Sequence, residues 1–316
     1  NKTAQIVCRL SSRPVIFSAN VHTVSDHNVK MHQEKHSTTR KMEQWLTEMG
    51  PGGSVSLTAC PRDEQIGIIK FNNPGKKNAL TGKMMSEFRG AVRDLSRKQL
   101  KAVLLRGEGG TFCSGGDLDF VEKIASEEGA FVMNSVMMKA LKKLITGDRM
   151  SVAVLEGHTM GGGTEIASAC DIRVAKRDAK VGFVQGKMGV CPGWGGGRYL
   201  VETLGRAKAI EYLGTAAIVS AEELHRIGYV SHVFDTEDQL QSWIEKVNNI
   251  DYTAFVAAKR MVNTYTTGLD YEEEEQKERK IFMSVWGQSH HLDSISAIRK
   301  GLAARKNHDK KWHKTH

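Results

Sequence analysis

Residues 151–175 read SVAVLEGHTMGGGTEIASACDIRVA, and this stretch decides the fold. The apolar run Ser151–Leu155 predicts a strand, and the triple glycine Gly161–Gly163 interrupts the chain before a helix begins. A second apolar run, Ile172–Ala175, predicts the next strand. A strand, a glycine-rich loop, a helix and another strand are typical of an α/β protein, in which the loops after the strands carry the chemistry.

The same alternation extends upstream to Ser54. The predicted strands are Val55–Thr58, Ile66–Phe71 and Ala102–Leu105, and the predicted helices are Gly82–Ser96 and Glu127–Gly147. After Gly205 the sequence predicts mostly helix, with one further strand at Tyr229–Phe234. We therefore expect four parts, which are a basic, largely disordered segment 1–53 with a short helix at Lys41–Glu48, a core 54–205, a helical region 206–305 and a basic tail 306–316.

The positive charge of the chain lies at its two ends. The 316 residues carry a formal net charge of +9, with 40% hydrophobic and 26% charged residues, a composition typical of a soluble globular protein. Residues 1–56 contribute +3 and residues 297–316 contribute +6, so residues 57–296 are neutral. No apolar run approaches the ~20 residues that a bilayer requires. We expect neither nucleic acid nor a membrane as a partner, and solvated tails rather than tails that bind a polyanion.

The cysteines and histidines indicate neither disulfides nor a metal site. Five cysteines form no short-spaced pair and no dense framework, which favours a reducing compartment. We expect the cytosol, with the mitochondrion as the alternative. Residues 1–42 combine Arg and Ser with few acids, as mitochondrial transit peptides do, but they lack the Arg-rich amphipathic helix of such peptides. The histidines after residue 200 have no acidic partners at ligand spacing, so we expect no metal.

Two glycine clusters follow two of the predicted strands, at Thr111–Leu118 and Met160–Glu165. A glycine run that enters a helix leaves unpaired N–H groups in front of the positive end of the helix dipole, and such a site favours an anion. Neither cluster has the spacing of a phosphate-binding loop or a dinucleotide fingerprint, and a triple glycine alone also fits a tight turn or close packing. If both loops meet, two N–H donors converge on one oxygen and form an oxyanion hole.

Several motifs of this chain occur in an order that one superfamily shares. They are Asn73-Pro74, Asn78-Ala79-Leu80, Phe112–Leu118, Gly161–Glu165, Ala169–Arg173 and Lys187–Gly197. With these motifs, residues 54–305 resemble the crotonase (enoyl-CoA hydratase/isomerase) superfamily. The resemblance implies a crotonase-like spiral of ββα units, completed by C-terminal helices that build a homotrimer or homohexamer. It also implies an acyl-CoA substrate and no cofactor, because CoA is part of the substrate.

The resemblance also assigns the residues of the candidate site. The two oxyanion-hole donors of the superfamily match the backbone N–H groups of Gly116 and Gly162. The residues that match the path of CoA and the acyl chain are Lys77, Ala79, Leu80, Ser114, Gly115, Asp117, Leu118, Met160, Gly161, Gln185 and Trp194. Lys76 and Lys77 match positions where cationic side chains meet CoA phosphates, but two solvated loop lysines fit the sequence equally well. His158 either faces the acyl pocket or is hydrogen-bonded in the core.

The acids and bases decide which reaction the site supports. Hydratases of the superfamily use two carboxylates, and Glu165 matches the first of these. At the second position this chain has Gln185, whose carboxamide cannot exchange a proton at neutral pH. Decarboxylation of a malonyl-type thioester needs no base to start, because the enolate charge lies on an oxygen that two N–H donors stabilise. Glu165 then either helps to deliver a proton to the resulting carbanion, directly or through water, or is a structural carboxylate at the start of a helix.

Shorter motifs narrow the expected substrate. Gly52-Gly53-Ser54, Phe183-Val184-Gln185, Pro192-Gly193-Trp194 and Val285-Trp286-Gly287 resemble the decarboxylases that act on ethylmalonyl-CoA. We therefore expect a carboxy-lyase that removes CO₂ from ethylmalonyl-CoA and methylmalonyl-CoA. The alternatives are an enoyl-CoA isomerase or weak enoyl-CoA hydratase in which Glu165 alone moves protons, and an RNA-binding or structural homologue that uses the basic tails.

Overall fold

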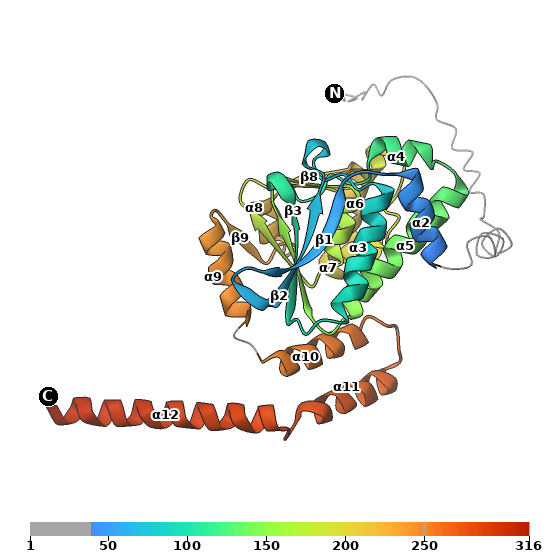
Figure 1. Ribbon diagram of the computed structural model, residues 1–316. Coiled ribbons are helices and arrows are strands. Elements are labelled where there is room, and N and C mark those ends of the chain that lie inside the picture. The colour runs from blue at the N-terminus through green and yellow to red at the C-terminus, as the bar shows by residue number, and fades with distance from the viewer. Residues whose placement is uncertain (1–38, 249–250, 316) are drawn as a thin grey trace, which may run out of the picture. The chain divides into compact units, whose positions relative to one another are not determined.

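The computed structural model describes residues 39–248 and 251–315, and a six-stranded sheet forms the centre of this part (Figure 1). In spatial order its strands are β1 (Ser54–Cys60), β2 (Asp63–Asn72), β3 (Ala102–Gly107), β4 (Met150–Leu155), β6 (Ile172–Lys176) and β9 (His232–Phe234). β1 pairs antiparallel with β2, and every other neighbouring pair is parallel. Because parallel neighbours need crossover connections, helices return the chain between them. The strands predicted from the sequence are thus confirmed.

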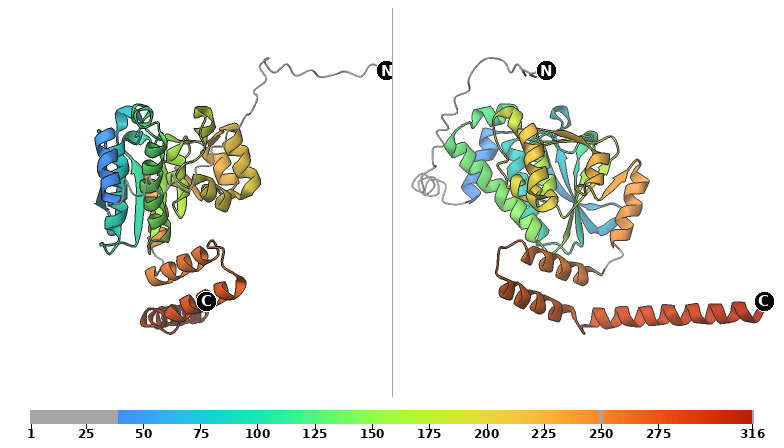
Figure 2. Two further views of the ribbon diagram at one scale, coloured as in Figure 1. Left: turned by 90° about the vertical axis from the view of Figure 1, so that its right-hand side faces the viewer. Right: turned by 180° about the vertical axis from the view of Figure 1, so that it is seen from behind.

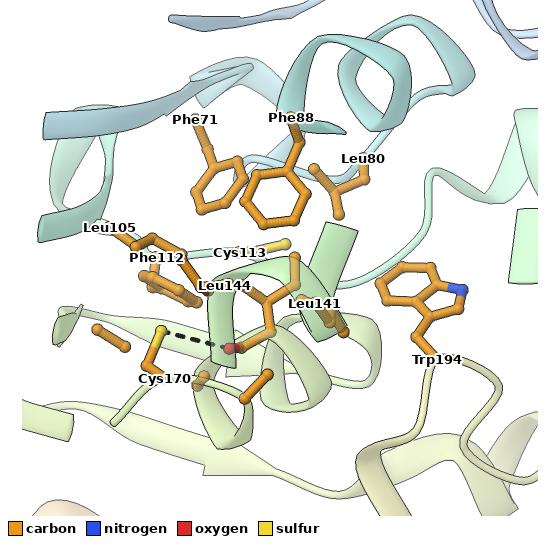
Figure 3. Close-up of a cluster of buried hydrophobic side chains, with 14 of the residues drawn as sticks. Phe71, Leu80, Phe88, Leu105, Phe112, Cys113, Leu141, Leu144, Cys170 and Trp194 are labelled. Atoms are coloured by element: carbon orange, nitrogen blue, oxygen red, sulfur yellow. Dashed lines mark hydrogen bonds between the residues drawn. The ribbon is translucent and has the colours of Figure 1, made fainter. Parts of the chain in front are cut away.

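Helices cover both faces of this sheet. α3 (Gly82–Leu95) and α5 (Glu127–Thr146) pack on one face, and α9 (Glu237–Asn248) packs on the other. The side chain of Thr81 caps the start of α3 by accepting from Met84 N at 3.2 Å. Figure 3 shows the larger core, in which the rings of Phe71 and Phe88 lie 5.6 Å apart and Phe112 meets Phe71 edge-on at the same distance. This aromatic cluster fixes the strands whose ends carry the candidate loops.

A second, smaller sheet carries part of the candidate site. Its strands are β5 (His158–Met160), β7 (Lys180–Gly182) and β8 (Ile218–Ser220), with β5 parallel to β7 and β7 antiparallel to β8. The sequence did not predict these strands, because three residues are too few to show an alternating pattern. β5 leads directly into helix α6 (Gly162–Ser168), so this sheet positions the triple glycine Gly161–Gly163.

Segment 1–53 contains the short helix predicted at Lys41–Glu48, which the structure shows as α2 (Thr39–Met49). Residues 1–38 lie outside the described residues, but α2 packs beside α3 and α5 (Figure 1 and Figure 2) with Met42 and Leu46 buried. A Cβ placed on Gly82 would lie 1.9 Å from the carbonyl oxygen of Leu46, so the close approach of the two helices requires glycine there. This amphipathic helix belongs to the core.

The region after Gly205 is mostly helical, as predicted. It contains the end of α7 (Gly196–Thr215), α8 (Ala221–Arg226), α9, α10 (Tyr252–Thr264), α11 (Tyr271–Val285) and α12 (Ser289–Thr315). The boundary at residue 205 falls inside α7, where the backbone of Gly205 leaves the helical region at φ 76° and ψ 164°. β9 of this region pairs with β6, so the helical region completes the central sheet. The basic tail 306–316 continues α12 as far as Thr315. The other elements are α4 (Leu118–Lys123) and the short 3₁₀ turns η1 (Pro74–Lys76), η2 (Glu108–Gly110) and η3 (Val184–Met188).

Candidate active site

The two glycine clusters meet in space. Cys113 pairs with the strand of the other cluster, since its N–H donates to His158 O at 3.1 Å and its carbonyl accepts from Met160 N at 2.9 Å. A Cβ placed on Gly115 would lie 3.1 Å from Met160 O and 3.4 Å from Gly162 N. The loops are therefore in van der Waals contact, as the expected oxyanion hole requires.

Both expected donors have free N–H groups. Leu80 N donates to Gly115 O at 2.7 Å, and Asp117 N donates to Leu80 O at 2.9 Å. Because successive amides of an extended chain point to opposite sides, the N–H of Gly116 points away from Leu80. Gly162 is the first residue of α6, where an N–H has no partner within the helix. Within residues 39–248 and 251–315, neither of these two N–H groups donates to a protein acceptor.

Trp194 fills the space next to the second donor. A Cβ placed on Gly162 would lie 2.3 Å from the indole ring of Trp194, so only glycine fits at this position. The indole is buried in the larger core (Figure 3). The loop that carries Trp194 is held from α5, because the side-chain amide of Asn134 donates to Gly193 O. The Trp194 indole therefore lies directly beside the free N–H of Gly162, on a loop that α5 helps to hold.

Glu165 binds a loop through both carboxylate oxygens. Oε1 accepts from Gly193 N at 3.1 Å, and Oε2 accepts from Trp194 N at 2.6 Å and from Gly196 N at 2.9 Å. The side chain is 4% exposed. Burial raises the pKa of Glu165 above its ordinary value, and the three amides and the Gln185 side chain, which favour the charged form, offset this only in part. Its carboxylate thus holds the loop 193–196 in place, one helical turn after Gly162.

Gln185 stands beside this carboxylate on η3. It is 7% exposed, and its amide lies close enough to the Glu165 carboxylate to favour the charged form of that group. It shares a narrow hollow with Thr164, Glu165, Ser168, Phe183, Pro192, Gly196 and Leu213. Half-buried His158, whose place the sequence left open, keeps one ring nitrogen, Nδ1, buried and without a partner among the described residues.

Comparison with known proteins shows the family of this chain. The family model for enoyl-CoA hydratase/isomerase matches residues 62–313. The chain belongs to the enoyl-CoA hydratase/isomerase family. The superfamily that the motifs resemble, and the crotonase fold expected from it, are thereby confirmed.

Relatives and solved structures of this family cover most of the chain. A Bos taurus relative named ethylmalonyl-CoA decarboxylase is 32% identical over 277 residues, covering 85% of this chain and 87% of that protein. An enoyl-CoA hydratase from Polaromonas sp. JS666 superposes with a TM-score of 0.72 at 25% identity, covering 79% of this chain and 98% of that one. A Thermobifida fusca YX protein in complex with acetoacetyl-CoA has a TM-score of 0.64 at 25% identity, covering 77% and 96%.

In this family member, two asparagines hold the loop 73–80 by hydrogen bonds, within the loop and to the segment that follows β3. Asn78 is fully buried, and its Nδ2 donates to Glu108 O at 2.8 Å and to Thr111 O at 2.6 Å. The Nδ2 of Asn73 donates to Ala79 O at 2.9 Å. Ala79 is buried as a result. The asparagines of the family motif are thus structural, and they hold the segment that pairs with Gly116.

The structure shows different surroundings for Lys76 and Lys77, which the sequence could not distinguish. The Lys76 ammonium lies 2.7 Å from carboxylates of both Asp117 and Asp119, and these hydrogen bonds raise the pKa of Lys76. Lys77 is exposed in a left-handed conformation at φ 50°, and no carboxylate pairs with it among the described residues. Lys76 therefore pairs with the carboxylates of the Gly116 loop, and Lys77 is an exposed cation without a carboxylate partner among the described residues.

The other expected residues of the site fall into buried and exposed groups. Ser114 donates through Oγ to Lys76 O at 3.1 Å, and Asp117 is buried and caps α4 by accepting from Phe120 N. Gly161 has φ 50° and ψ −116°, which only glycine adopts readily. Leu118 is exposed, and Met160 packs against Gly182.

Cys113 and possible metal ligands were the remaining candidates for reactive groups near the site. Cys113 is fully buried, and burial raises the pKa of its thiol to about 12, so it does not act as a nucleophile. In the part of the chain that the structure describes, no group of three His, Cys, Asp or Glu side chains is placed to hold a metal ion. None of the described helices is both long and apolar enough to cross a membrane.

Sequence reasoning missed the backbone amides that bind Glu165, together with Asn134. A signal for the amides was present, because Gly193, Gly195 and Gly196 in one short loop mark a close backbone approach. A Cβ placed on Gly196 would lie 2.4 Å from the Glu165 side chain, which explains that glycine. Nothing in the sequence pointed from Asn134, 59 residues earlier in the chain, to Gly193.

Proposed function

We propose that this protein decarboxylates malonyl-type CoA thioesters, with ethylmalonyl-CoA and methylmalonyl-CoA as substrates. The observation that carries the proposal is the pair of free N–H groups of Gly116 and Gly162 on two loops in contact. Two relatives support the choice of substrate class, one named ethylmalonyl-CoA decarboxylase and one structure that holds acetoacetyl-CoA. CoA enters as part of the substrate, and the proposal needs no resident cofactor.

The chemistry follows from where charge develops. When the bond between the α-carbon and the carboxylate breaks, CO₂ leaves and the electron pair forms an enolate with its negative charge on the thioester oxygen. The N–H groups of Gly116 and Gly162 donate to that oxygen and stabilise it more than the neutral carbonyl, which lowers the barrier. A proton then adds to the α-carbon to give the shorter acyl-CoA. No base has to remove a proton first.

Glu165 and Gln185 favour this reaction over the others of the family. Isomerases and hydratases need a carboxylate that is free to take up and return a proton. Three backbone amides already engage the carboxylate of Glu165, and Gln185 cannot exchange a proton. Lys77 and the exposed Leu118 border the path that we assign to CoA. The four described cysteines are unpaired thiols, which supports a reducing compartment such as the cytosol.

The assay that tests the proposal offers three thioesters in parallel. Purified protein is incubated with ethylmalonyl-CoA, methylmalonyl-CoA and crotonyl-CoA, and CO₂ release and hydration are followed separately. We expect CO₂ release from both malonyl thioesters and little or no hydration of crotonyl-CoA. Hydration or double-bond migration without CO₂ release would assign the site to a hydratase or isomerase. No turnover of any thioester, together with tight binding of RNA, would favour a non-enzymatic role for the basic ends.

We further propose that α11 and α12 contact other copies of the chain in a homotrimer or a dimer of trimers. None of the described residues of α11 is buried, and apolar side chains stay exposed on both helices. These side chains are Phe282, Met283, Trp286, Leu292, Ile298 and Leu302. Exposed apolar patches of this kind mark interfaces between proteins.

Sedimentation equilibrium tests the assembly. We expect a mass of three or six times the 35.0 kDa of one chain. A double variant, Phe282→Asp with Trp286→Asp, should sediment as smaller species, because a charge in an apolar interface is costly to bury. Gln276→Asp on the same helix is the matched control and should keep the wild-type mass. A monomeric wild-type protein would contradict the proposal.

A further inference from the structure

One peptide group of the loop that carries Trp194 is held from two sides. Its carbonyl, that of Gly193, accepts from Nδ2 of Asn134 on α5. Its N–H, that of Trp194, donates to Oε2 of Glu165 on α6 at 2.6 Å. A peptide group is planar, and its C=O and N–H point to opposite sides. Because both ends of this group are bonded to helices, its plane is fixed, and the Cα of Trp194 is fixed with it.

The place of the Trp194 indole bears directly on the second oxyanion donor. A Cβ placed on Gly162 would lie 2.3 Å from the indole, so the ring packs against the Cα of this glycine. On its other side, Gly162 N would lie 3.4 Å from a Cβ placed on Gly115. Glycine has no side chain to restrict its backbone, so its orientation depends on such neighbours. The indole and the Gly115 loop together hold the free N–H of Gly162.

The helix that carries Asn134 also belongs to the loop of the first donor. α4 begins directly after that loop, and its Val121 side chain would lie 2.9 Å from a Cβ placed on Gly116. Only residues 124–126 separate α4 from α5, and the side chain of Ser126 caps α5 by accepting from its first turn at 3.1 Å. The amide of Asn134 therefore links the segment that follows the first donor to the loop that packs on the second.

We propose that Asn134 is a positioning residue of the oxyanion hole, which holds the Trp194 indole against Gly162 and so keeps the second donor aimed at the thioester oxygen. The inference rests on the proposed decarboxylation for the rate that it affects. Asn134 acts through the loop and not on the substrate. A displacement of about 1 Å at a reacting centre can cost about 100-fold in rate, so a hydrogen bond to the supporting loop can have a large effect.

Asn263 provides a matched control, because it makes the same kind of hydrogen bond elsewhere on α5. Its Nδ2 donates from α10 to Ile145 O at 3.2 Å, and both asparagines are half-buried. Ile145 precedes the start of β4, whereas Gly162 follows its end, so this bond lies at the opposite edge of the sheet from the oxyanion hole. Loss of either bond leaves one backbone carbonyl unpaired and should cost similar stability.

The kinetic test uses Asn134→Leu, which removes the donor and keeps the size of the side chain. We expect kcat for CO₂ release from ethylmalonyl-CoA to fall about 10- to 100-fold. KM should stay within about threefold, because the residues that we assign to the CoA path lie on other loops. Asn134→Asp has the shape of asparagine but a carboxylate that cannot donate, so it should show the same loss. Asn263→Leu should melt at a similarly lowered temperature and keep the wild-type kcat.

Fluorine NMR of protein labelled with fluorotryptophan reports the position of the indole directly. The chain has five tryptophans, and Trp194→Phe identifies the resonance of Trp194. We expect this resonance to move in both Asn134 variants and to stay unchanged in Asn263→Leu. A fall in kcat without a change of the resonance would overturn the inference. An unchanged kcat in Asn134→Leu, or an equal fall in Asn263→Leu, would overturn it as well.

The two proposals fail in different ways. If the wild-type protein releases no CO₂ from ethylmalonyl-CoA, the proposed function is wrong, but the fluorine spectra still show whether Asn134 holds the indole. A resonance of Trp194 that moves in the Asn134 variants and not in Asn263→Leu then supports the positioning role. A resonance that stays in place contradicts that role whichever reaction the protein catalyses.

Discussion

Replacing Gly116 with proline should reduce the rate of decarboxylation on the order of 10²- to 10³-fold while the protein still folds. Proline has no N–H, so the variant loses one of two donors to the enolate oxygen. The N–H of Gly116 has no partner among the described residues, so no internal hydrogen bond is lost with it. The loss should appear in kcat, because the donor stabilises charge that exists only after CO₂ begins to leave.

The control for this substitution is Gly116→Ala. Alanine keeps the N–H and adds only a Cβ, which would lie 2.9 Å from a terminal methyl of Val121, a side chain that can yield. Its effect on kcat should be several times smaller than that of proline, and thermal melting should show that both variants are folded. If proline and alanine reduce kcat equally, the loss reflects crowding, and Gly116 is not a donor. A proline variant with wild-type kcat leads to the same conclusion.

Much of the site could be predicted from the sequence because clustered glycines mark tight turns and close approaches of the backbone. The clusters around Gly116 and Gly162 each follow a strand, and the ends of parallel strands meet at one edge of a sheet. Their contact across Gly115 was therefore a reasonable expectation, and the structure shows it. The exchange of an acid for Gln185 was also readable, since it concerns the type of residue rather than its position.

Contacts between distant segments could not be predicted from the sequence. The role of Glu165 depends on amides of the loop 193–196, which reach it only after β7 and η3 turn the chain back. The difference between Lys76 and Lys77 depends on two carboxylates, 41 and 43 residues after Lys76, and on which lysine side chain points toward them. The sequence predicted the helix at Lys41–Glu48 but not its packing, because the net charge of a segment does not report where the apolar face of a short helix packs.

The contact of Asp171 with a distant segment could not be predicted from the sequence either. Loss of this contact should have the largest effect on stability. The sequence placed Asp171 in a family motif without a role, and the structure gives it a buried partner on α10. Lys259 Nζ lies 2.7 Å from Asp171 Oδ2 and also donates to Arg149 O at 2.8 Å and Leu144 O at 3.3 Å. The Lys259 side chain is only 6% exposed, so its charge depends on these partners.

Lys259→Met should therefore lower the free energy of unfolding by about 3–5 kcal/mol, because it leaves a half-buried carboxylate without its cation. The Oδ2 atom of Asp171 keeps its hydrogen bonds from Ser151, which limits but does not remove the loss. Arg260→Met is the matched control. Arg260 is the next residue of the same helix and pairs with Asp148 at the surface, so its loss should cost less than about 1 kcal/mol. Urea denaturation of both variants measures the difference, and equal midpoints would show that α10 is not held by the buried pair.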